Sequence, residues 1–151
     1  MKGKLFLKIF GTYLAIAVLA IGIVGFLAGN QIQAKLEQQI EDELMAYAGI
    51  VDLYPMKEIE SRAEEIARIA RARVTVLDRE GKVLAETDRE ASALGSHLER
   101  PEIQEVRVRG RGTATRYSQT LREQMMYVAL PIRKGQETVG YIRLARPLDD
   151  V

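Results

Sequence analysis

Arginine and tyrosine side chains in the second half of the sequence are the best candidates for binding chemistry. Arg116 and Tyr117 are adjacent, and Tyr127 falls on the next expected strand. A guanidinium binds a carboxylate or phosphate through two parallel hydrogen bonds, and phenolic hydroxyls can add further ones. In the alternative, Arg116 pairs with an acid on a neighbouring strand and the tyrosines pack on a sheet. The expected contacts to a small ligand are Arg116, Tyr117, Tyr127 and Arg100.

The composition supports no other kind of active or metal site. The chain has no cysteine, which excludes a thiol nucleophile, a disulfide and a cysteine-bound metal. His97 is the single histidine, and the pattern offers it no fellow metal ligand. Glu41, Asp42 and Glu43 are consecutive, so a helix spreads them over different faces. We therefore expect no catalytic residue, no cofactor and no metal in this chain.

Charge is nearly balanced over the whole chain. Lys and Arg total 22 and Asp and Glu total 21, for a formal net charge of +1. This balance argues against nucleic-acid binding, which requires a clear basic excess. The densest basic cluster is Arg107, Arg109 and Arg111. It offers a site for an anion or an acidic partner, or it is a solvated surface.

The N-terminal region has the composition of a membrane anchor. No charged residue occurs between Ile9 and Ala34, and a helix needs roughly 20 apolar residues to cross a bilayer. Three lysines precede this segment and acidic residues follow it, so the positive-inside rule places the N-terminus in the cytoplasm. A cleaved signal peptide is the alternative, but its apolar core is usually shorter. We expect a cytoplasmic segment at 1–8, a transmembrane helix at 9–29 in the cytoplasmic membrane, and an extracytoplasmic remainder.

A second helix is expected to continue outward from the membrane over residues 30–54. Apolar residues recur along it at steps of three or four, which makes one continuous apolar stripe. Little else in the sequence lies near the membrane to cover this stripe. We therefore expect a homodimer whose interface contains Leu36, Ile40, Leu44 and Tyr47.

The remaining residues, 55–151, read as an α+β domain. The helical period continues to about Ala72 and changes at Arg73 to the alternation of a β-hairpin, with Gly81 in its turn. A short helix is expected near Pro101, because proline suits a first helical turn. The expected fold class is α+β: a transmembrane helix and a membrane-proximal helix, then an antiparallel sheet of about five strands with helices on one face. The last three strands are expected at Gly112–Thr120, Gln124–Arg133 and Glu137–Pro147.

Five segments carry a resemblance to a known family. They are the hairpin Arg73–Asp88, the segment His97–Glu105 and the strands around Gly112–Ser118, Met126–Ile132 and Val139–Ala145. Together with the N-terminal helix, they resemble the extracytoplasmic PAS-like (Cache-type) sensor of bacterial histidine kinases, and most of all the phosphate-regulon sensor kinase type. In similar domains, the strand that holds Arg116 and Tyr117 faces the ligand cavity. The resemblance therefore implies a dimeric sensor domain that detects a small ligand or an envelope protein.

The kinase machinery that such sensors drive is not part of this sequence. Kinases of this type continue into a second membrane helix, a HAMP linker, a phosphoacceptor helix and an ATP-binding domain. We therefore expect the sensing and transmembrane-signalling portion of a two-component histidine kinase, which would reach a response regulator only through the kinase part. The alternative is a single-pass membrane-anchored protein that binds a ligand or partner without kinase output.

Overall fold

A computed structural model describes residues 2–51, 54–87, 97–118 and 121–148. Its contacts divide the chain into two compact units, residues 1–36 and residues 37–151, and each is described by itself. The last two positions of the strand expected at Gly112–Thr120 lie outside the described residues.

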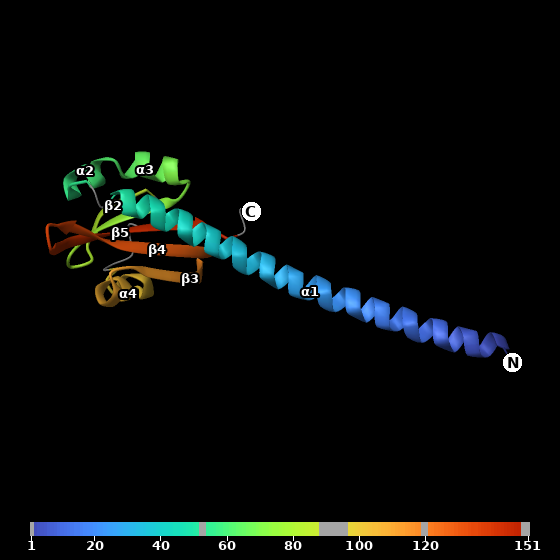
Figure 1. The fold of residues 1–151 in the computed structure, drawn as a ribbon. Coiled ribbons are helices and arrows are strands. Elements are labelled where there is room, and N and C mark those ends of the chain that lie inside the picture. Colours follow the sequence, from blue (N-terminus) through green and yellow to red (C-terminus); the bar gives the residue numbers. More distant parts are fainter. Residues whose placement is uncertain (1, 52–53, 88–96, 119–120, 149–151) are drawn as a thin grey trace. The chain divides into compact units, whose positions relative to one another are not determined.

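The N-terminal unit is the first part of helix α1 (Lys2–Val51), drawn in blue in Figure 1. Its most apolar 18-residue stretch has a mean hydropathy of 2.3, and none of that stretch is buried. Large side chains such as Ile21, Val24 and Phe26 are mostly exposed. Exposed apolar side chains all around a helix of this length suit a lipid environment, so α1 is long and apolar enough to cross a membrane.

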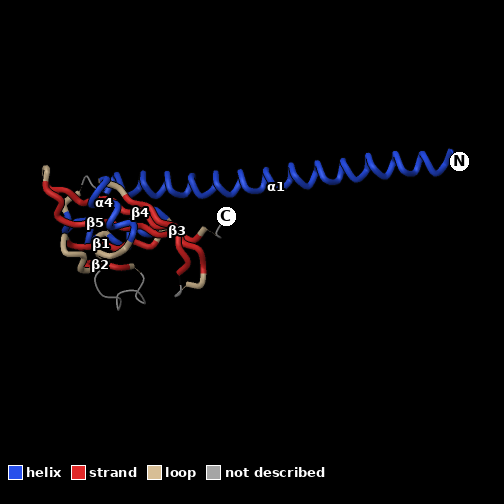
Figure 2. The backbone as a smooth tube through the Cα atoms, turned by 90° about the horizontal axis from the view of Figure 1, so that it is seen from below, coloured by secondary structure: helices blue, strands red, loops and turns tan. Residues whose placement is uncertain are grey.

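The C-terminal unit is built on a five-stranded antiparallel sheet with the strand order β2-β1-β5-β4-β3. Figure 2 shows these strands side by side. The expected hairpin is confirmed: Gly81 stands in its turn with a φ of 80°, a conformation that favours glycine. The strands are β1 (Arg73–Asp78), β2 (Val83–Glu86), β3 (Gly112–Ser118), β4 (Glu123–Lys134) and β5 (Glu137–Pro147).

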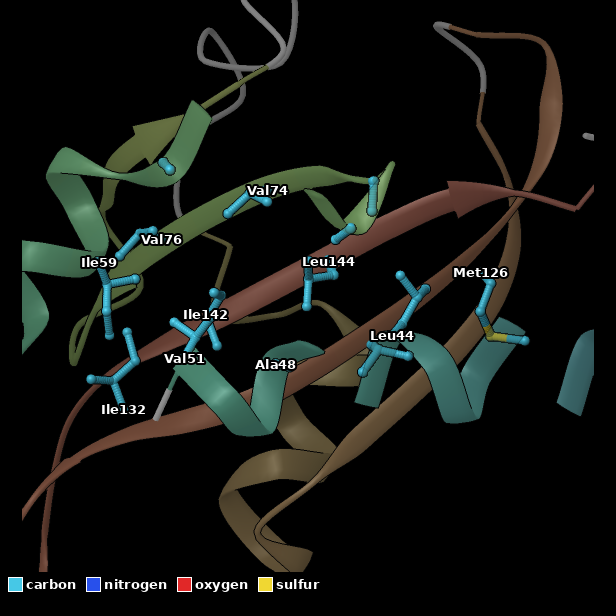
Figure 3. Close-up of a cluster of buried hydrophobic side chains, with 14 of the residues drawn as sticks. Leu44, Ala48, Val51, Ile59, Val74, Val76, Met126, Ile132, Ile142 and Leu144 are labelled. Carbon is cyan, nitrogen blue, oxygen red and sulfur yellow. The ribbon is translucent and has the colours of Figure 1, made fainter. Parts of the chain in front are cut away.

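One face of the sheet packs against α1, α2 (Met56–Ser61) and α3 (Ala63–Ala70). Leu44 of α1 and Leu144 of β5 have no exposed surface and belong to this core, as Figure 3 shows. The single helix expected up to Ala72 is interrupted at Arg62, whose φ of −105° and ψ of 11° are not helical. The break lets both short helices cover the sheet with their own apolar residues.

The opposite face is covered by α4 (Pro101–Arg109), the helix expected near Pro101. Ile103 and Val106 of α4 are buried against Leu77 and Tyr141. Side chains alternate between the two faces of a strand, so these two sheet residues point away from α1. The α+β fold class is confirmed, with one difference from the expectation: helices cover both faces of the sheet rather than one.

The apolar stripe on the second half of α1 has a different role from the one expected. Ile40 is 5% exposed and Leu44 is 0% exposed, and both lie in the core that α1 forms with the sheet. Tyr47 is partly buried against the same core. The prediction of a dimer interface is therefore wrong for Ile40 and Leu44, because the domain's own strands cover the stripe. Leu36 falls in the N-terminal unit and is partly exposed.

Candidate functional site

A cluster of buried charged side chains lies on the sheet face that α4 covers. Its centre is Arg143 of β5, which stands between Ile142 and Leu144 and is only 2% exposed. Those two neighbours point into the core beneath α1. Strand alternation therefore turns Arg143 toward α4. Thr75 of β1 is paired directly with it across the sheet.

Glu102, the second residue of α4, is the carboxylate on which two arginines converge. It is completely buried, and its Oε1 accepts hydrogen bonds from Arg116 Nη2 at 3.1 Å and Arg143 Nη1 at 3.4 Å. Its position in the first helical turn also places it near the positive end of the helix dipole. Gly112 permits the close approach of α4 to the sheet, because an added Cβ there would collide with the Glu102 carbonyl oxygen.

The cluster continues from Arg143 to the edge of the sheet. Arg143 Nη2 donates to Thr75 Oγ1 at 2.9 Å, and the Thr75 hydroxyl donates to Glu86 Oε2 at 2.7 Å. Glu86 also pairs with Arg73, whose Nε lies 3.0 Å from Glu86 Oε1. Polar contacts thus run without interruption from β2 to α4, and each is strengthened by its low-dielectric surroundings.

The Tyr127 ring of β4 packs against the guanidinium groups of Arg116 and Arg143. The guanidinium carbon of Arg116 lies 3.9 Å from the centre of the Tyr127 ring, and that of Arg143 lies 5.5 Å from it. Both distances are within the range in which a cation is attracted to a ring face. The ring therefore stabilises positive charge at a place where water is scarce.

The cluster consists mainly of paired charges. Within the described residues, three arginines (Arg73, Arg116 and Arg143) pair with two glutamates (Glu86 and Glu102). Burial lowers the pKa of Arg143 below its ordinary value, and the nearby Glu102 charge acts in the opposite direction. Burial therefore disfavours the charged form of Arg143, and its acidic partner offsets part of that cost.

Within the described residues, three buried polar atoms of the cluster also have no hydrogen-bond partner. They are Glu102 Oε2, Arg116 Nε and Arg143 Nε. Buried polar groups are nearly always hydrogen-bonded in folded proteins, so unmet ones call for a structural or functional reason. Two N–H groups that can donate and one carboxylate oxygen that can accept are therefore left without partners among the described residues.

The structure brings together two of the four residues predicted to bind a ligand. Arg116 and Tyr127 are in contact, whereas Tyr117 is 54% exposed and lies on the opposite face of β3. The structure therefore does not bring Tyr117 to this site. Arg100 precedes α4, and its carbonyl oxygen accepts hydrogen bonds from the amides of Ile103 and Gln104. The partner of Arg116 is an acid on a helix, not the cross-strand acid considered above.

Sequence reasoning missed Glu102 and Arg143. A signal was present in β5, where Arg143 stands between two apolar residues of a strand that is buried on both faces. Charged residues are almost never fully buried unless they are paired, so such a position predicts a partner. The signal for Glu102 was weaker, because a glutamate in a first helical turn is common on exposed helices.

Surface clefts lie elsewhere in the C-terminal unit. One, of about 280 Å³, is mainly apolar and is lined by residues of α1, α2 and α3, such as Ile50 and Ile69, and by Tyr54 between α1 and α2. Another, of about 390 Å³, lies at the C-terminal end of α4 and is lined by residues that include Arg107 and Arg133. In the part of the chain that the structure describes, no group of three acidic, histidine or cysteine side chains could hold a metal ion.

Comparison with known proteins identifies the family. The sequence matches the single Cache-like family over residues 30–147. The chain belongs to this family. The matched residues form a Cache-like domain, and the apolar first part of α1 is consistent with a membrane anchor. No curated protein has a sequence that matches this chain.

Solved structures of other sensor domains have the same fold. The sensor domain of the V. cholerae histidine kinase DctB gives a TM-score of 0.61 at 13% identity, covering 82% of this chain and 57% of that one. The E. coli DcuS sensor domain gives 0.58 at 12% identity, covering 76% and 93%. The ligand-binding domain of the Campylobacter jejuni chemoreceptor Tlp3, in complex with 4-methylisoleucine, gives 0.57 at 13%, covering 80% and 59%. This Cache chain therefore spans little more than half the length of the DctB and Tlp3 domains.

Proposed function

We propose that this Cache chain is the sensing and transmembrane-signalling portion of a two-component sensor histidine kinase of the phosphate-regulon type. One observation carries the signalling part of the proposal: a single sheet separates the charged cluster from the second half of α1. Arg143 lies in the cluster on one face, and its neighbour Leu144 lies on the other face in the core that contains Leu44. A change in the packing of Arg143 on the α4 face is therefore passed to α1 through the adjacent residue, Leu144.

The signalling step requires two arrangements of this core that a stimulus favours differently. A ligand or envelope protein that binds the α4 face more tightly in one arrangement shifts the population toward it. Arg116, whose side chain is 29% exposed, is the cluster arginine most open to solvent. Tyr127 beneath it completes the proposed contact. Packed cores shift between discrete arrangements, so a small displacement of β5 is passed to α1 as a translation or rotation.

The end of β5 also supports a signalling role. Arg146, near its end, forms a 2.8 Å salt bridge with Glu43 of α1, and the amide of Leu148 donates to the Gln124 carbonyl. The last strand is thus tied to the same stretch of α1 that the core holds.

The proposed homodimer needs a surface other than the buried stripe. Ile50 and Ile69 are more than half exposed and line the apolar cleft between α1 and α3. The rim of that cleft carries both Arg62 and Glu65, so two copies related by a two-fold axis could pair opposite charges. Cysteine crosslinking of the full chain in membranes tests this surface: a cysteine at Ile50 should crosslink, and one at Lys57, outside the cleft, should not.

The coding sequence beyond Val151 tests the kind of parent protein. A second apolar segment followed by a phosphoacceptor histidine and an ATP-binding domain is the expected result. A chemoreceptor signalling region in its place would refute the kinase proposal and leave the sensor fold unaffected. A stop codon would favour the alternative, a membrane-anchored binding protein. Calorimetric titration of the full chain with inorganic phosphate tests the stimulus, and absence of heat would argue against direct phosphate sensing.

A further inference from the structure

Glu102 takes the position that the carboxylate of a bound molecule would take against two arginines. Its Oε1 is within 3.4 Å of both Arg116 Nη2 and Arg143 Nη1, and the residue has no exposed surface. The carboxylate comes from α4, on the other side of the cluster from the sheet that carries the arginines. Arginine pairs in folded proteins recognise carboxylates by the same charge-assisted hydrogen bonds.

Glu102 makes fewer hydrogen bonds to the two arginines than a free carboxylate could make. Both arginines donate to Oε1, while Oε2 and the Nε atoms of the two arginines have no hydrogen-bond partner within the described residues. A free carboxylate could use both oxygens at once. The geometry of Glu102 is instead fixed by α4, whose Ile103 and Val106 are held in the adjoining apolar core.

We infer that Glu102 is the specificity-determining residue of this site, a resident carboxylate that closes the arginine pair to free carboxylates. The inference rests on the proposed sensing role of the α4 face and narrows what that face can detect. A carboxylate ligand would have to displace Glu102 and leave it buried without a cationic partner, which is costly. The α4 face therefore responds to stimuli that contact the surface of α4 or the exposed part of Arg116, and not to free carboxylates that bind between the two arginines.

Removing the Glu102 side chain should turn the closed site into an open one. Glu102→Ala removes a CH2 group and a carboxylate, which together correspond to acetate. The full chain in detergent micelles can be followed by the near-ultraviolet circular dichroism of tyrosine, since it has six tyrosines and no tryptophan. Loss of a buried charge partner should lower the melting temperature of the sensor domain by roughly 10 °C in sodium chloride.

Acetate should then restore part of the lost stability. For a Kd of about 10 mM, 100 mM acetate raises the melting temperature of Glu102→Ala by about 5 °C over chloride at equal ionic strength. The wild-type chain should show no acetate-specific shift. Glu105→Ala is the matched control, because Glu105 lies on the same helix but pairs with the exposed Arg109. It should lose some stability and gain none from acetate.

If Glu102→Ala is folded, two results would overturn the inference. One is an acetate-specific stabilisation of the wild-type chain equal to that of Glu102→Ala, which would mean that the site is open. The other is a folded Glu102→Ala variant that acetate does not stabilise. If the variant is unfolded in chloride, recovery of its folded spectrum in rising acetate supports the inference, and no recovery refutes it. None of these readouts involves signalling, so they fail independently of the proposed kinase function.

Discussion

Shortening Leu44 tests whether the second half of α1 belongs to the sensor core. Leu44 has no exposed surface and packs with Leu144 and other residues of the sheet. Leu→Ala at fully buried sites costs about 2–5 kcal/mol, from lost burial and from the cavity that remains. A value near 3 kcal/mol is expected for Leu44→Ala, because α1 is fixed on both sides of the site and the cavity cannot collapse fully. For a domain of this size the melting temperature should fall by roughly 12 °C.

Chemical and thermal unfolding of the full chain in micelles, followed by tyrosine circular dichroism, measures this loss. The matched control is Leu27→Ala on the same helix, because Leu27 is 55% exposed and belongs to the N-terminal unit. The control should leave the unfolding of the sensor domain unchanged. A cost below about 1 kcal/mol for Leu44→Ala, accompanied by loss of dimers, would refute the reasoning and restore Leu44 to a dimer interface.

Three further substitutions or conditions probe other parts of the sensor domain. The hydrogen bond from Arg146 lowers the pKa of Glu43 in the folded state. This contact therefore stabilises the fold at pH values above the unfolded-state pKa of Glu43, and the stabilisation is lost as the pH falls through the folded-state pKa. The unfolding free energy measured in urea at pH 7 and pH 3 should depend less on pH in Arg146→Met than in the wild-type chain. Gly81→Ala should cost about 1–2 kcal/mol in unfolding free energy, since φ at this turn is 80°, and a neutral result would contradict the turn geometry. Tyr127→Leu should lower the unfolding free energy by about 1 kcal/mol more than the loss of buried apolar area explains, because Arg116 loses its contact with the ring face. A double-mutant cycle with Arg116→Met measures the coupling energy of this pair, and a coupling energy of zero would exclude a stabilising cation–ring contact.

The elements of the sensor domain could largely be predicted from local sequence patterns. Gly81 predicted the hairpin turn and Pro101 the start of α4, because both act through their own backbone preferences. The stripe at Ile40 and Leu44 was also recognised as a buried helical face. What covers that face could not be predicted, since a periodic pattern shows that a side is buried but not which surface buries it.

The candidate site depended on contacts between elements far apart in the sequence. Arg116 and Tyr127 were identified because they lie on neighbouring strands, where register brings them together. The contact of Glu102 with Arg143 joins a helix to a strand 41 residues away. Nothing in the spacing of these two residues fixes it, because it depends on which face of the sheet α4 covers.

Hydrogen exchange of the full chain in micelles tests most directly whether the sheet couples the charged cluster to α1. Arg143→Met removes the centre of the cluster and leaves the apolar core beneath α1 in place. The account predicts that amides at 40–51 exchange faster in this variant, by a larger factor than the amide of Val128 in the same core. Faster exchange confined to α4, with residues 40–51 unchanged relative to Val128, would contradict it.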